Sequence, residues 1–259
     1  MKVNPLMGVR MKTEKIESVT EFLTVVEKVS LTHFNKSLKH RVKQAGHILY
    51  RGQGEDFPLL PKIARENEDK NPLAKESYML SELQIRGAVH RNLSNLDVWG
   101  LLTLAQHYGL ATRLLDWTRN PLVALWFSCS DRKSEDHPHV YILLPHWDID
   151  YLDRDVLLET EQLIGTSILR TRLEDTRVVA QDGWFTVHSP SRKYGKFIPL
   201  GELDHHAEGM VKIEVNAKNK GTILKDLDTL GISYQSIFPD LEGVCRYINW
   251  KSENVDNEY

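Results

Sequence analysis

The amino-acid sequence predicts a single α+β domain with a mixed or antiparallel sheet flanked by helices. Segments with apolar side chains at helical spacing are interspersed with short segments that are β-branched or alternate between apolar and polar residues. No internal repeat or low-complexity linker divides the 259 residues. We therefore expect one domain over 18–251, with an N-terminal extension over 1–17 and a flexible tail over 252–259.

Helices are predicted where an apolar stripe follows a capping residue. Ser18 and Glu21 have the spacing of a capping box, in which the Ser accepts from a first-turn N–H and the Glu reaches back. Asp97 suits the N-cap of a helix over 98–108, and Pro121 suits the first position of another. Further helices are expected over 76–90, over 223–230 and from residue 239.

Strands are predicted from β-branched content and period-two alternation. The segment 140–145 is rich in β-branched residues, whereas 184–188 and 210–215 alternate as half-buried strands do. A fourth short strand is expected over 47–52, where it ends at a glycine.

The composition, 41% hydrophobic and 27% charged, is that of an ordinary soluble globular chain. No apolar stretch approaches the ~20 residues that span a bilayer, and the first residues lack the apolar core of a secretory signal. We therefore expect a cytoplasmic protein with no membrane partner, in which Cys129 and Cys245 are buried free thiols.

Charge and motif content argue against several functions. The net charge of −3 gives no global attraction to nucleic acid, and the basic stretches 36–43 and 191–196 are interpreted as solvated surface. Phosphate-binding loops ending in Lys-Ser/Thr, Gly-x-Ser-x-Gly elbows and His-Glu-x-x-His helices are missing from the sequence. This argues against Walker ATPases, α/β-hydrolases and common zinc peptidases, and no metal is expected.

One apolar run, residues 99–127, carries an unusual set of polar side chains. A polar group buried without a partner costs about 1–3 kcal/mol, so a segment that served only as core would avoid them. We interpret the run as part of a functional site. The polar residues that carry this interpretation are Gln106, His107, Thr112, Arg113, Asp116 and Thr118.

Structural interpretations of these residues stay open. His107 lies in a last helical turn, where a His favourably opposes the helix dipole. Arg113 must be paired or face a ligand, because an unpaired buried guanidinium is not tolerated. Asp116 can be that partner or cap the helix that starts near Asn120, and Trp117 can be core or can stack on a planar ligand.

Two further segments are candidates for the same site. In Tyr50-Arg51-Gly52-Gln53 an Arg at a strand end precedes a glycine, an arrangement that can project a guanidinium over a crevice toward an anion. A simple turn is the alternative. In the segment 180–186, Gln181 and Gly183 precede a strand, and a structural role is favoured there.

These segments resemble the FRG domain family over about residues 48–248. The resemblance rests on 50–53 with Pro61 and Arg65, on 106–118 with Asn120, Pro121 and Ala124, and on 181–185, 230–232 and 237–243. Tyr50 stands where the family has Phe, and Ala111 where Pro is common; neither changes the charge pattern.

The resemblance implies a bacterial or phage-related setting, and its motif layout is similar to that of ADP-ribosyltransferases. It implies NAD as substrate, a nucleic-acid or protein acceptor, an antitoxin partner, and a toxin or antiviral-defence role. Arg51 would then bind the diphosphate and Trp117 or Tyr108 flank nicotinamide, while His107, Asp116 or Gln181 acts at the ribose. Gly183 lies where the superfamily would favour a Glu. The other expected ligand contacts are Tyr50, Gly52, Gln53, Gln106, Thr112 and Arg113.

Two alternatives remain at this stage. A metal-independent nuclease would use His107 as acid, Arg113 as anion clamp and Asp116 as orienter. A nucleotide- or nucleic-acid-binding module would hold its ligand through Arg51, Arg113 and the stretch 192–196 without catalysis.

Overall fold

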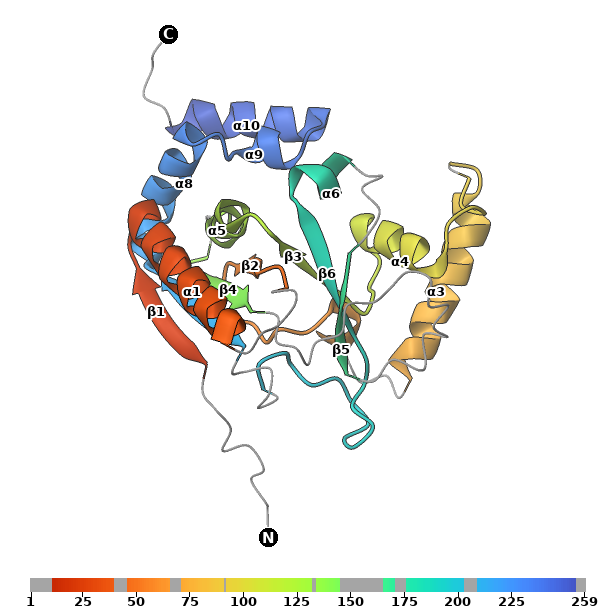
Figure 1. The fold of residues 1–259 in the computed structure, drawn as a ribbon. Helices are drawn as coiled ribbons and strands as arrows, with labels where there is room; N and C mark the ends of the chain where they lie inside the picture. Colours follow the sequence, from red (N-terminus) through yellow and green to blue (C-terminus); the bar gives the residue numbers. More distant parts are fainter. Residues whose placement is uncertain are drawn as a thin grey trace.

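The computed structural model describes residues 11–39, 46–65, 71–90, 92–131, 134–144, 165–170, 176–202 and 209–254. These residues form an open seven-stranded mixed sheet with helices packed against it (Figure 1), which confirms the predicted α+β class. The strand order is β1-β7-β4-β2-β3-β6-β5. The strands are β1 Lys12–Ile16, β2 Leu49–Gln53, β3 Leu114–Thr118, β4 His139–Leu143, β5 Thr166–Leu169, β6 Gly183–His188 and β7 Met210–Val215.

Three helices begin directly after the capping residues that the sequence indicates, at Val19, Val98 and Pro121, whereas the helix expected over 76–90 begins at Pro72 and ends at Gly87. The Asp97 side chain accepts from Gly100 N at 2.6 Å, and Asn120 caps the helix after it by accepting from Leu122 N at 3.0 Å. Ser18 accepts from Glu21 N at 3.2 Å, but the Glu21 carboxylate reaches Glu17 N instead of Ser18. The helices are α1 Val19–Lys39, α2 Lys62–Arg65, α3 Pro72–Gly87, α4 Val98–His107, α5 Pro121–Cys129, α6 Thr176–Ala180, the 3-10 helix η1 Ala217–Asn219, α8 Lys220–Thr229, α9 Tyr234–Ile237 and α10 Leu241–Asn254.

The middle of the sheet opens between β2 and β3. β2 pairs with β4 through all five of its residues, whereas its register with β3 holds one pair, Tyr50 with Thr118. The remaining neighbours pair in antiparallel fashion except β1 and β7, which are parallel. The two central strands therefore separate beyond that pair.

Helices cover one face of the sheet in two groups. α1, α5 and α8 bury apolar side chains over β1, β7, β4 and β2, and α3 and α4 do so over β3, β6 and β5. A separate apolar cluster, which includes Trp117 and Tyr141, forms on the opposite face. The gap between β2 and β3 lies where the two helical groups meet.

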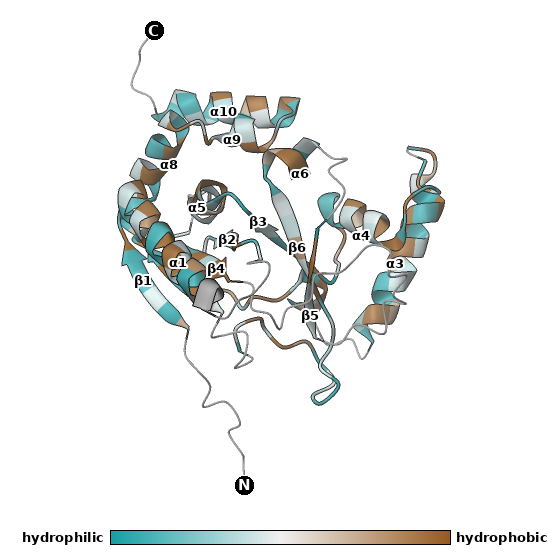
Figure 2. Ribbon diagram, viewed as in Figure 1, coloured by the Kyte–Doolittle hydropathy of each residue, from teal (hydrophilic) through white to brown (hydrophobic). Residues whose placement is uncertain are grey.

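Three strands were not predicted from the sequence. β1 lies within the segment expected as an extension, yet it pairs with β7 along five residues. It is an edge strand of largely hydrophilic residues (Figure 2), so it lacks the apolar alternation of an inner strand. β3 and β5 have five and four residues, too few for periodicity to separate them from helix or loop. Because α10 ends at Asn254, the first three residues of the expected tail are helical.

The two cysteines differ in their surroundings. Cys129 is buried, as expected, and burial raises the pKa of its thiol to about 11. The prediction that Cys245 is buried is wrong, because this residue of α10 is exposed. None of the described helices is both long and apolar enough to cross a bilayer. The side chains of the basic stretch 36–43 lie outside the described residues, whereas Arg192 and Lys193 are exposed.

Gly52 is a position where the fold requires glycine. A Cβ there would lie 1.9 Å from the Ala124 carbonyl oxygen of α5, and backbone cannot move aside as a side-chain tip can. We expect Gly52→Ala to lower the free energy of unfolding by about 3 kcal/mol in urea denaturation. Gly54→Ala is the matched control, because its Cβ would meet nothing nearer than 3.5 Å, and a change within about 1 kcal/mol is expected. Equal losses in both variants would contradict this account.

Candidate functional site

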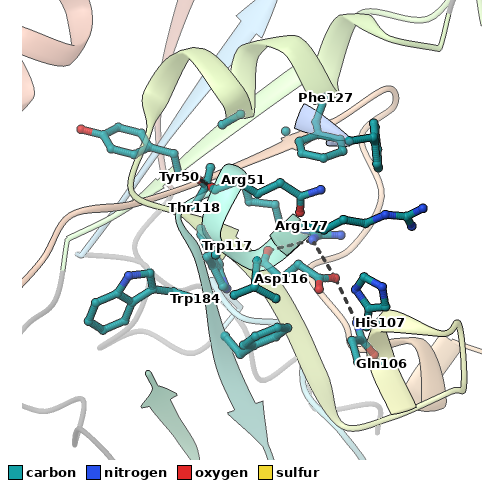
Figure 3. A pocket seen from close by; sticks show the side chains of 17 residues that line it. Tyr50, Arg51, Gln106, His107, Asp116, Trp117, Thr118, Phe127, Arg177 and Trp184 are labelled. Carbon is teal, nitrogen blue, oxygen red and sulfur yellow. Dashed lines mark hydrogen bonds and ion pairs between the residues drawn. The ribbon is translucent and has the colours of Figure 1, made fainter. Parts of the chain in front are cut away.

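A pocket of about 360 Å³ lies at the opening between β2 and β3 (Figure 3). This volume is in the range of small-molecule sites. Eight of the residues predicted for the site line it: Tyr50, Arg51, Gly52, Gln106, His107, Asp116, Trp117 and Gln181. Gln53, Thr112 and Arg113 are not among the lining residues.

Arg51 extends from β2 into the opening. Its Nη1 donates to the Asp116 backbone carbonyl at 2.8 Å, and its Nε donates to Gln53 Oε1 at 3.1 Å. The side chain is 14% exposed, and among the described residues its Nη2 has no partner. Burial lowers the pKa of Arg51 to about 10, partly offset by Asp116, so the group stays cationic at neutral pH. Arg51 therefore presents one free edge of a charged guanidinium to the pocket.

The Asp116 carboxylate faces the same pocket from β3. Its Oδ2 accepts from Gln106 Nε2 at 3.0 Å and lies 3.9 Å from Arg51 Nη1 (Figure 3). The side chain is 57% exposed, and no described residue bonds to Oδ1. The structure thus places Asp116 in a strand, where it does not cap the helix near Asn120.

The last turn of α4 supplies Gln106 and His107. Gly109, at φ +85°, ends the turn and leads the chain back toward β3. The His107 ring lies edge-on to Tyr108, with 4.9 Å between their centroids, and His107 lines the pocket while Tyr108 is exposed.

The opposite wall comes from α5, α6 and the turn between α9 and α10. Arg177 Nη2 donates to Asp240 at 2.5 Å, and its guanidinium lies 5.5 Å from the centre of the Phe238 ring. Phe127 and Phe238 are in edge-on contact at 6.1 Å. Sequence reasoning missed all three lining residues, because a lone Arg and two Phe in apolar stretches carry no pattern that separates ligand contact from packing.

Two residues predicted as ligand contacts, Arg113 and Trp117, have partners within the protein. Arg113 is buried, and its Nε donates to Glu76 Oε2 at 2.5 Å while its backbone N donates to Oε1 at 2.6 Å. Its partner is therefore Glu76 of α3 and not Asp116. Trp117 lines the pocket, while its Nε1 donates to Thr186 at 2.9 Å and its side chain belongs to the apolar cluster on the face opposite Asp116.

The remaining predicted residues hold the site together. Thr112 donates to Gln106 Oε1 at 2.6 Å, and Gln53 donates to the Phe57 carbonyl at 2.9 Å. Gln181 lines the pocket but donates its side-chain amide to the Ile237 carbonyl at 3.3 Å. In the described part of the chain, no group of three His, Cys, Asp or Glu residues is placed to bind a metal.

Residues 46–137 match the family model described as the FRG domain. The matched segment runs from the start of β2 past the end of α5 and contains Arg51, Gln106 and Asp116. Comparison with curated proteins and with solved structures gave no match.

The buried pair of Arg113 and Glu76 is expected to anchor the loop before β3. Burial raises the pKa of Glu76 and the Arg113 charge opposes this. Neutralising Glu76 therefore removes a charged partner that the buried Arg113 contacts through both its side chain and its backbone. We expect Glu76→Gln to lower the free energy of unfolding by about 3–5 kcal/mol in urea denaturation. Glu82→Gln, in an exposed pair with Arg86 on the same helix, should change it by less than about 0.5 kcal/mol. An unchanged free energy of unfolding in Glu76→Gln would show that the pair contributes nothing to stability.

Proposed function

We propose that this member of the FRG domain family binds NAD in the pocket between β2 and β3 and cleaves the bond between nicotinamide and ribose. It would act as an ADP-ribosyltransferase or as an NAD-cleaving enzyme. The observation that supports this most is that Arg51 Nη2 and Asp116 Oδ1 face one pocket without partners among the described residues. One is a charged donor and the other a charged acceptor, as a phosphate next to a ribose requires.

Each wall of the pocket suits a different part of NAD. The Arg51 edge would donate to a diphosphate oxygen. Asp116 would accept from a ribose hydroxyl and stabilise positive charge on the ribose ring as the bond to nicotinamide breaks. Phe127 and Phe238 offer apolar ring surface for a planar base, the role that Trp117 and Tyr108 were expected to fill.

The reaction needs no cofactor beyond NAD itself. When the bond between ribose C1′ and the nicotinamide nitrogen breaks, its electron pair leaves with nicotinamide. Water or a nucleophilic acceptor then bonds to C1′ and loses a proton, which His107, a lining residue of the pocket, would accept. An enzyme that consumed NAD in this way would suit a toxin in bacterial or phage conflict.

Nucleotide binding without catalysis is the second candidate. It is favoured by the hydrogen bond that already occupies the Gln181 side chain. The Gln181 amide is engaged by Ile237, and Asp116 is the one carboxylate among the described lining residues. The nuclease hypothesis has less support, since Arg113 is buried against Glu76 and cannot clamp a ligand here.

Nicotinamide release from NAD by the purified protein tests catalysis. We expect Asp116→Asn to reduce kcat about 10²–10³-fold, because it removes the charge that opposes the cationic ribose. Arg51→Lys should mainly raise KM, since Lys keeps the charge but loses the planar edge. Arg86→Ala, an exposed Arg of α3, is the control and should match the wild type.

The same assay with cell lysate and labelled NAD tests transfer to an acceptor. Absence of both nicotinamide release and labelled product would overturn the catalytic proposal. If ADP-ribose still raised the Tm of the wild type but not of Arg51→Lys, the binding-module candidate would replace it.

A further inference from the structure

Thr112 is a fully buried polar residue of the loop between α4 and β3 and does not line the pocket. Its hydroxyl donates to Gln106 Oε1 at 2.6 Å and accepts from Leu114 N at 3.2 Å. A hydroxyl has one hydrogen, so the bond to Gln106 uses its whole donor capacity. The Leu114 N–H in turn fixes the hydroxyl oxygen at the start of β3.

This bond decides which way the Gln106 amide faces. With Oε1 bonded to Thr112, the amide nitrogen is directed at Asp116 Oδ2, 3.0 Å away. In the reversed orientation an amide oxygen would meet a carboxylate oxygen, and an NH₂ group would meet the hydroxyl. Thr112 thereby determines that Asp116 receives a donor on Oδ2, which leaves Oδ1 as the acceptor that faces the pocket.

We propose that Thr112 and Gln106 are positioning residues that hold Asp116 as the acceptor for a sugar hydroxyl of the ligand. The proposal rests on the proposed function for the nature of that ligand. A group that meets Oδ1 has to donate a hydrogen bond, which a hydroxyl can do and a fully ionised phosphate cannot. The pocket would therefore bind the sugar through Asp116 and the anion through Arg51. Thr112 and Gln106 would support only the sugar contact.

Two probes separate these roles: ADP-ribose, which carries both groups, and inorganic pyrophosphate, which carries the anion alone. We expect Thr112→Val to weaken ADP-ribose binding about tenfold in calorimetry, the equivalent of one hydrogen bond, and to change pyrophosphate binding less than twofold. Thr112→Ser keeps the hydroxyl and should restore ADP-ribose binding. Equal weakening of both probes, or no effect of Thr112→Val, would overturn the proposal.

A second measurement does not depend on the ligand. The side-chain NH₂ signal of Gln106 in NMR, assigned by its loss in Gln106→Leu, should exchange slowly with water in the wild type and in Thr112→Ser, and faster in Thr112→Val. Unchanged exchange in Thr112→Val would overturn the positioning role. If wild type bound neither probe, the proposed function and the sugar contact would fall, and the NMR result would still decide whether Thr112 orients Gln106.

Discussion

The site depends on how the backbone groups find hydrogen-bond partners where β2 and β3 separate. Strands that diverge leave carbonyl and N–H groups without ladder partners, and such groups cannot stay unpaired in a protein interior. At this opening the Arg51 guanidinium donates to the Asp116 carbonyl at 2.8 Å. It thereby replaces the backbone N–H that a neighbouring strand would supply in a continuous sheet. On the helical face Gly52 allows α5 to approach the β2 backbone directly. The opening is therefore part of the architecture, and the same residue that bridges it carries the charge of the pocket.

This arrangement keeps the charges in the pocket nearly balanced. Asp116 lies 3.9 Å from Arg51, close enough to offset part of the burial that lowers the pKa of Arg51. A pocket built in this way attracts a ligand less by net charge than by matching a donor and an acceptor to it. A polyanion would gain from Arg51 and be repelled by Asp116, whereas a ligand with a hydroxyl beside its anion gains from both.

Much of the fold and part of the site could be predicted from the sequence, because helix caps and apolar periodicity are local signals. They predicted the helices that begin after Asp97 and Asn120. The polar run predicted that Gln106 and Asp116 belong to one site, and both line the same pocket. Partners distant in the chain could not be predicted. Nothing local marks Glu76 as the partner of Arg113, 37 residues away, or brings Phe238 to the wall opposite Asp116. β1 was missed because an edge strand needs no apolar face to pair.

The polar run falls into two layers, which explains why so many polar residues lie in an apolar segment. Gln106, His107 and Asp116 face the pocket, while Thr112 and Arg113 are buried behind them. Glu76 bonds to both the backbone and the side chain of Arg113, so α3 fixes the loop from which Thr112 reaches Gln106. Each buried polar group in this layer has a partner, so burial adds rigidity without leaving an unpaired charge. The Asp116 carboxylate needs this support to keep one oxygen bonded and the other open to the pocket. If Gln106 were mobile, Asp116 could turn toward Arg51, and neither group would then be available to a ligand.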